Sequence, residues 1–122
     1  MEQPKVISVD NVKYIREDSI KQVAEKVDGM KYVMVRTVNA GVFAGYLKEK
    51  NGETIILKNA RRMWYWSGAA SLSQLAMEGT KKVSDCKFPC EVDTIELTQV
   101  IEIIDCTEEA RLSIKSVPVW KA

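Results

Sequence analysis

Five residues in the middle of the chain, Arg61, Arg62, Trp64, Tyr65 and Trp66, have the chemistry to bind a planar anionic ligand. Aromatic rings stack on nucleobases, and a guanidinium donates charge-assisted hydrogen bonds to phosphate. Alternate side chains of a strand share a face, which places Arg62 with both tryptophans and Arg61 with Tyr65. The pattern predicts a stacking platform beside a phosphate contact. The competing interpretation is that the tryptophans fill the core or a subunit interface, with the arginines reaching outward.

Small and hydroxylated residues follow this segment and lead into a predicted helix. Ser67 and Gly68 break the strand, and Ser71 with Gln74 has the spacing of a capping box. Helix N-termini favour anions, and Ser67, Ser71 and Ser73 would supply further neutral donors to a ligand. The glycine spacing and Lys-Ser/Thr pair of a phosphate-binding P-loop are both missing. A capped helix packed on a sheet accounts for the same residues.

Asn59 and Phe43 complete the candidate ligand-binding residues. Asn59 could read a base edge, and Phe43 could close the site from a neighbouring strand or subunit. Small residues surround Phe43 over residues 39–45 and permit close approach of a ligand or a second subunit, although a turn and a bent strand are the favoured explanation. Trp120 and Lys121 would either swap onto a neighbouring subunit or pack within their own.

The titratable residues argue for binding rather than catalysis. The chain has no histidine, which excludes a Cys–His pair and every triad that uses histidine as its base. Glu96 and Glu102 are too far apart along their predicted strand to form an acid–base pair. Three cysteines, Cys86, Cys90 and Cys106, are an odd number for a disulfide framework and offer too few ligands for a closed zinc site. We therefore expect no enzyme activity, no metal and no cofactor.

Length and composition are those of one globular domain over residues 1–122, with 46% hydrophobic and 29% charged residues. No apolar run approaches the roughly 18 residues that span a bilayer, and no secretory leader is visible, so we expect a cytosolic protein without membrane contact. The net charge of +1 argues against binding long nucleic acid through bulk electrostatics. Basic residues prevail over 44–87 and acids over 88–110, an asymmetry that would steer a small anion, pair two subunits, or simply form two solvated faces.

The hydrophobic spacing predicts short helices and long strands around these residues. Residues 19–27 fit an amphipathic helix with a capping box at Ser19 and Gln22, ended by Asp28-Gly29. Further helices are predicted after Ser71 and after Thr107. Strands are predicted over residues 31–38, 42–50, 53–66 and 92–105, with Asn51-Gly52 as a hairpin turn.

These elements predict an α+β fold with a curled antiparallel sheet and two or three short helices. The stretch VMVRTVNAGVFAGYLKEKNGETIILKNARR is similar in pattern to a small Sm-like or SH3-like barrel, in which Gly45 would permit strand bending.

The segment NARRMWYWSGAASLSQLAMEG, with RTVNAGVFAG before it and VIEIIDCT and VPVWKA after it, resembles a family of small phage and prophage proteins. The resemblance covers residues 31–122 and leaves residues 1–30 as an N-terminal extension. In size and context such proteins are similar to anti-defence sponges, which sequester cyclic nucleotide signals of bacterial antiphage systems such as CBASS and are typically homo-oligomers.

The resemblance implies a phage counter-defence protein that binds a cyclic oligonucleotide signal in the cytoplasm of the infected host without cleaving it, as a homo-oligomer, with a tetramer favoured. One alternative is an Sm-like module that binds single-stranded nucleic acid. The other is a structural phage protein with no small ligand, in which the aromatic residues would form a protein interface.

Overall fold

The computed structural model describes residues 7–8, 12–13 and 22–122. The first two segments form a small antiparallel pair, β1 (Ile7–Ser8) and β2 (Val12–Lys13). The remaining elements are β3 (Lys31–Thr37), β4 (Val42–Asn51), β5 (Thr54–Arg62), α1 (Leu72–Glu78), the 3-10 turn η2 (Val83–Asp85), β6 (Val92–Leu97), β7 (Val100–Asp105) and α2 (Glu108–Ser116). The fold is α+β, as predicted.

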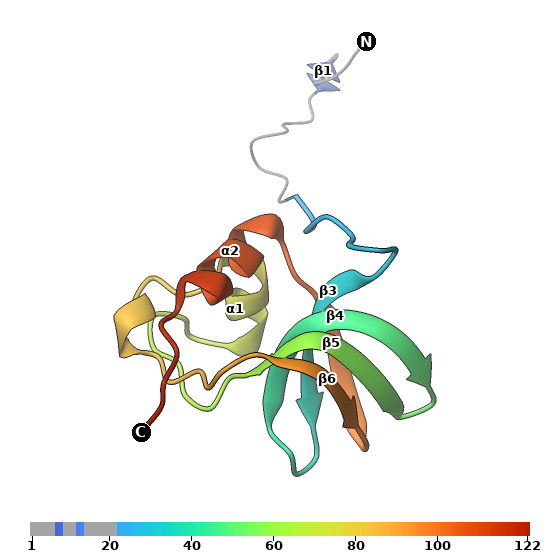
Figure 1. Ribbon diagram of the computed structural model, residues 1–122. Helices are drawn as coiled ribbons and strands as arrows, with labels where there is room; N and C mark the ends of the chain where they lie inside the picture. The colour runs from blue at the N-terminus through green and yellow to red at the C-terminus, as the bar shows by residue number, and fades with distance from the viewer. Residues whose placement is uncertain (1–6, 9–11, 14–21) are drawn as a thin grey trace.

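The large sheet has five antiparallel strands in the order β6-β5-β4-β3-β7 (Figure 1). Its edge strands, β6 and β7, follow one another in the chain with only Thr98 and Gln99 between them. A flat sheet of five strands would separate its edges by about 19 Å, whereas this link spans at most about 11 Å. The sheet must therefore curl, which confirms the predicted curled sheet.

Two backbone hydrogen bonds draw the curled sheet together. Val38 N donates to Gln99 O at 3.1 Å, and Val100 N donates to Glu53 O at 2.9 Å, so the turns at the strand ends meet. In the part of the chain that the structure describes, no ladder joins β6 to β7, so the sheet is curled but not closed. The Sm-like or SH3-like barrel stays a prediction, since the described strands form a curled sheet and not a closed barrel. The register of β4 against β5 shifts beside Gly45, where we predicted a bend.

Alternating side chains give the sheet two apolar faces. Val33 and Val35 point into the sheet cluster, whereas Tyr32 and Met34 point into the helix-side cluster. The sheet cluster lines the inside of the curl and comprises Val33, Val35, Phe43, Ile55, Leu57, Ala60, Leu97 and Val100. On the other face, α1 and α2 pack together (Figure 1) and supply Leu72, Leu75, Ala76, Ala110 and Ile114 to the helix-side cluster.

Both helices begin at the predicted caps. The Ser71 hydroxyl accepts from Gln74 N at 3.1 Å, and α1 ends at Gly79 with φ of 74°. The Thr107 hydroxyl accepts from Ala110 N at 3.1 Å at the start of α2. No helix among the described residues is long and apolar enough to cross a membrane.

The predicted helix over 19–27 is wrong where it can be checked, and residues 19–21 lie outside the described residues. Residues 22–27 are not helical, because residues 22–24 pair through their backbone with the segment that leads from β7 into α2. Ala24 N donates to Cys106 O at 3.1 Å, and Glu108 N donates to Gln22 O at 2.9 Å. Asp28 and Gly29, both with positive φ, form a two-residue turn instead of a helix end.

Two predicted strands are shorter than expected. The strand predicted over 53–66 ends at Arg62, after which Met63 N donates to Val42 O and the chain leaves the ladder. The strand predicted over 92–105 is two strands, because Gln99 adopts φ of 56° and reverses the chain onto the opposite edge of the sheet. The hairpin at Asn51-Gly52 is confirmed, with Asn51 paired to Thr54 across the turn.

Candidate functional site

Arg61 is a buried structural residue, which corrects the prediction that it contacts phosphate. Its side chain is 6% exposed. Nε donates to Pro89 O at 2.9 Å, Nη1 to Ile114 O at 2.8 Å and Nη2 to Phe88 O at 3.1 Å, all backbone carbonyls. Burial lowers the pKa of Arg61, yet a guanidinium stays charged at neutral pH. Its hydrogen-bonding edge is occupied within the fold.

Arg62 is the arginine that faces solvent. It is exposed, and its guanidinium carbon lies 4.6 Å from the centre of the Phe43 ring. That ring is 1% exposed and belongs to the sheet cluster, so Phe43 supports Arg62 rather than closing a ligand site. No carboxylate of the described residues pairs with Arg62, which leaves its donors available to an anion.

The three aromatic residues after Arg62 do not form one row. Because β5 has ended, strand alternation no longer fixes their directions. Trp66 is partly buried against the helix-side cluster, as the core interpretation expected. Trp64 and Tyr65 are exposed by 62% and 52%. Tyr65 instead pairs with Lys87 in an isolated antiparallel bridge, through N–H···O bonds of 3.3 and 2.8 Å.

Lys87 joins two of the exposed rings. Its Nζ lies 6.0 Å from the centre of the Tyr65 ring and 5.7 Å from that of Trp120. Trp120 is 46% exposed and reaches this place because its N–H donates to Phe88 O at 2.9 Å, next to the Tyr65–Lys87 bridge. We call Tyr65, Lys87 and Trp120 the ring–lysine surface.

A hollow of about 330 Å³ adjoins the ring–lysine surface. It is lined by Pro89, Trp120, Lys121 and Ala122. The hollow and the two half-exposed rings give a ligand an apolar contact on one side and an ammonium on the other, an arrangement typical of small-molecule recognition. Trp120 packs against its own chain, which is the second of the two outcomes we considered for it.

No pattern in the sequence singles out Lys87 as a ligand-binding residue. It lies far from the arginines in the chain, and its role depends on the bridge to Tyr65 and on the return of the chain to Phe88. For Trp120 the sequence predicts only a swap onto a neighbouring subunit or packing within its own, not a ligand contact. The sequence shows only that Lys87 carries a positive charge and Trp120 an aromatic ring, and many other residues of the chain do the same.

Of the three serines in the predicted anion pocket, Ser71 caps α1, and the backbone carbonyl of Ser67 bonds the loop that follows the helix. Ser67 O accepts from the Thr80 hydroxyl and from Cys86 Sγ. The Ser71 hydroxyl caps α1, and the side-chain oxygen of Gln74 accepts from Ala70 N at 2.8 Å. Two of the N–H groups at this helix start are therefore already paired. Ser73 is exposed on α1, a helix of seven residues. The predicted anion pocket at the α1 start is not formed.

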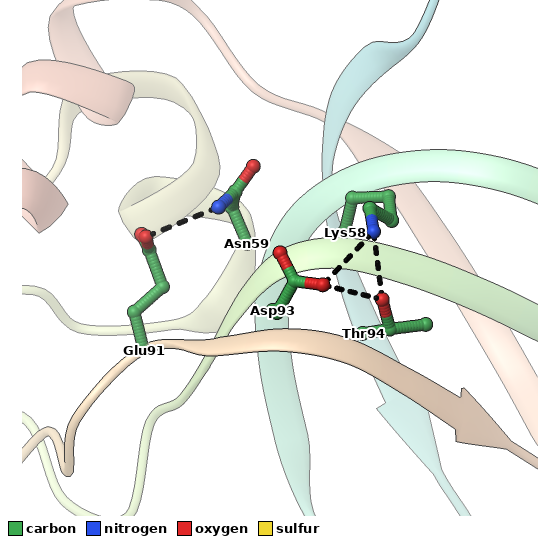
Figure 2. A network of polar contacts seen from close by, with 5 residues as sticks. All are labelled: Lys58, Asn59, Glu91, Asp93 and Thr94. Atoms are coloured by element: carbon green, nitrogen blue, oxygen red, sulfur yellow. Dashed lines mark hydrogen bonds and ion pairs between the residues drawn. The ribbon is translucent and has the colours of Figure 1, made fainter.

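Asn59 lies in a polar network between β5 and the chain entering β6 (Figure 2). Its Nδ2 is 3.5 Å from Glu91 Oε1, the limit of a hydrogen bond, and the other Glu91 oxygen is 3.2 Å from Lys115 Nζ. Lys58 Nζ lies 3.1 Å from Asp93 and 2.8 Å from the Thr94 hydroxyl. The bond from Lys58 lowers the pKa of Asp93. Asn59 is exposed and faces a carboxylate at this limiting distance, so its contact with a base edge stays a prediction.

Ion pairs within the chain account for much of the charge asymmetry. Five acids of the 88–110 region lie within ion-pair distance of a lysine or arginine, namely Glu91, Asp93, Glu102, Asp105 and Glu108. These acids are matched inside one subunit, so the asymmetry does not by itself indicate subunit pairing. Within the described residues Lys87 has no such carboxylate, and only its two aromatic neighbours are recorded. Its charge remains available to an anion.

Neither a metal centre nor a disulfide is built from the described residues. No three of their His, Cys, Asp and Glu side chains are grouped to hold a metal ion. Cys86 and Cys106 are buried free thiols, and Cys90 is an exposed one. Burial raises the pKa of Cys106 to about 12, which keeps this thiol protonated and unreactive.

The fold and the surface define a small α+β protein with a curled antiparallel sheet and an exposed site of two aromatic rings around an ammonium. Residues 30–114 match the model of a family described as a domain of unknown function, DUF6948, and the chain belongs to this family. Comparison with curated proteins and with solved structures finds no match. Tyr65 and Lys87 lie inside the matched region, whereas Trp120 and most of the hollow lie beyond it.

Proposed function

We propose that the protein is a non-catalytic binding protein for a nucleotide ligand, and that it sequesters a cyclic oligonucleotide immune signal without cleaving it. The observation that carries the proposal is the ring–lysine surface. The Lys87 ammonium, which pairs with no carboxylate in the part of the chain that the structure describes, lies over two half-exposed rings, 6.0 and 5.7 Å from their centres. Flat rings suit bases, and the ammonium suits a phosphate.

Magnitudes favour a ligand that engages more than one such surface. Two stacked bases would contribute about 2–6 kcal/mol, and a charge-assisted hydrogen bond about 1.5–3 kcal/mol. Micromolar binding already requires about 8 kcal/mol, and association itself has an entropic cost. One surface therefore falls short of the affinity that sequestration needs. A homo-oligomer, with a tetramer favoured, would present several copies to one cyclic ligand.

The class of ligand rests on the resemblance of the NARRMWYWSGAASLSQLA segment to small phage and prophage proteins, together with the surface chemistry. On this proposal the protein acts in the cytoplasm of the infected bacterial host and counters an antiphage system. Arg62 remains in the proposal as the exposed guanidinium, held over Phe43 and free to contact phosphate.

Native mass spectrometry would test the proposal by reporting oligomer size and bound mass together. The panel is cyclic di-AMP, cyclic di-GMP, cyclic GMP–AMP, cyclic tri-AMP and oligothymidylates of 5 and 20 nucleotides. We expect an oligomer that retains one cyclic ligand with unchanged mass. A ligand released with an altered mass, or no binding by any panel member, would contradict the proposal; the latter result would favour the structural phage protein.

Matched variants would locate the site. Trp120→Ala and Lys87→Gln should each weaken binding at least tenfold. The controls Leu112→Ala and Lys81→Gln remove an exposed apolar residue and an exposed lysine elsewhere, and they should leave binding unchanged. If the two controls weaken binding as much as the site variants, the ring–lysine surface is not the site.

Arg62→Ala tests the phosphate contact separately. Binding should weaken while the oligomer persists, because the side chain is exposed and its recorded contact is the Phe43 ring. A variant that only unfolds would mark Arg62 as structural.

Exposed rings with lysine also support the second candidate, an Sm-like module for single-stranded nucleic acid. That function predicts affinity that rises from 5 to 20 nucleotides and falls steeply with salt. A sponge would discriminate among cyclic ligands and ignore oligothymidylate length.

A further inference from the structure

Residues 117–122, which we call the strap, leave α2 and return along the protein surface. Val117 is 3% exposed, and its N–H donates to Ile114 O at 3.2 Å. Val119 then forms a parallel bridge with Phe88, and Trp120 N donates to Phe88 O at 2.9 Å. The strap lies outside the region that matches the family model, yet it supplies three of the four residues that line the hollow.

Arg61 connects the strap to the domain. Phe88 O accepts from both Arg61 Nη2 and Trp120 N, at 3.1 and 2.9 Å. Ile114 O likewise accepts from both Arg61 Nη1 and Val117 N, at 2.8 and 3.2 Å. One buried guanidinium thus orients both carbonyls on which the strap docks. The Phe88 ring in turn contacts this guanidinium, with the centre of the ring 5.4 Å from Arg61 Cζ.

We infer that the strap completes the ligand-binding surface, that Trp120 is its ligand-contacting residue, and that Arg61 is a positioning residue that acts through the Phe88 and Ile114 carbonyls. The inference rests on the proposed function for the identity of the ligand. The docking of the strap is independent of it.

Docking and ligand binding are coupled. Val119 and Trp120 remain 49% and 46% exposed, so the docked end of the strap buries little surface and opens locally at low cost. A ligand that binds only the docked strap lowers the equilibrium population of the open strap by about the factor 1 + [L]/Kd, or roughly 100-fold at 100 times Kd. Segments that open independently gain no such protection.

Amide hydrogen exchange of the intact chain tests docking without any ligand. The Trp120 amide should exchange at least tenfold more slowly than its unstructured rate. In Arg61→Lys this protection should fall at least fivefold, while the Gly79 amide, bonded to Leu75 O at the end of α1, keeps its rate. An unprotected Trp120 amide in the wild-type protein would overturn the docked strap. Equal losses at Trp120 and Gly79 would overturn the positioning role and make Arg61 a general stability residue.

Removal of residues 119–122 tests the ligand role, since the deletion keeps the buried Val117. The deleted protein should bind the cyclic nucleotides of the panel at least tenfold more weakly than wild type, and Leu112→Ala, which changes an exposed residue of α2 outside the strap, should bind them normally. Normal binding by the deleted protein would overturn the ligand role of the strap and leave the proposed function standing. If the wild-type protein binds no cyclic nucleotide, the proposed function and this ligand role both fall, while the exchange result still decides docking.

Discussion

Replacement of Arg61 by methionine would show whether this arginine holds the fold together. Methionine keeps most of the apolar length of the side chain but removes all of its donors. The guanidinium bonds three backbone carbonyls, of which two keep a second donor: Phe88 O retains Trp120 N, and Ile114 O retains Val117 N.

The expected cost follows from what is left without a partner. Pro89 O, whose recorded donor is Arg61 Nε at 2.9 Å, is orphaned in a partly buried position, at about 1–3 kcal/mol. Loss of the contact with the Phe88 ring adds about 0.5–2 kcal/mol. Release of a buried charge from its desolvation offsets part of this sum. We expect a net loss of about 3 kcal/mol in the free energy of unfolding.

Urea denaturation followed by tryptophan fluorescence and by circular dichroism would measure the loss. Arg62→Met is the matched control, because the neighbouring guanidinium is exposed and lies over the Phe43 ring; it should cost less than about 1 kcal/mol. If Arg61→Met unfolds within 0.5 kcal/mol of wild type, or if both variants lose the same stability, the structural role assigned to Arg61 is wrong.

Three further predictions concern the rest of the fold. Gly79→Ala should lower the free energy of unfolding by about 2–3 kcal/mol, because φ is 74° and the new Cβ would lie 2.3 Å from Ser113 Cβ; Gly52→Ala, with nothing within 4 Å, should cost about 1 kcal/mol. Thr107→Val removes the cap of α2 and should cost about 2 kcal/mol, measured by thermal unfolding; no loss would mean that the cap contributes nothing. Burial raises the pKa of Cys106 from 9.0 to about 12, so stability should fall between pH 9 and 12, where only the unfolded thiol ionises. Cys106→Ala should flatten this decline in urea titrations, and an unchanged slope would refute the assignment.

Local signals in the sequence predicted the elements whose structure is set locally. Ser71 and Thr107 cap their helices because the hydroxyl and its N–H partner lie within one turn. The curled sheet followed from alternating strands and a bend at Gly45. The helix predicted over 19–27 is wrong because Gln22 and Ala24 form backbone hydrogen bonds with Glu108 and Cys106, which lie far away in the chain. A local sequence pattern does not report such long-range pairing.

The candidate site was harder to predict than the fold. Two adjacent arginines look equivalent in the sequence, yet one is 6% exposed and the other faces solvent. The two arginines differ because three backbone carbonyls from distant parts of the chain accept hydrogen bonds from Arg61. Tyr65 is among the predicted ligand-binding residues and its ring is exposed, but its ligand contact stays a prediction. Lys87 and Trp120 reach it through bridges that link separate parts of the chain.

The two-residue link between β6 and β7 also bears on how the domain folds. The β4–β5 hairpin closes over a short turn and can form early, whereas Val33 must wait for Asp105 before β3 gains its second neighbour. Leu97 and Val100, which flank the link, complete the sheet cluster inside the curl. During synthesis the hairpin would therefore leave the ribosome before Leu97 and Val100 can pack against its apolar face. The domain becomes a cooperative unit only when the chain beyond Gln99 has left the ribosome.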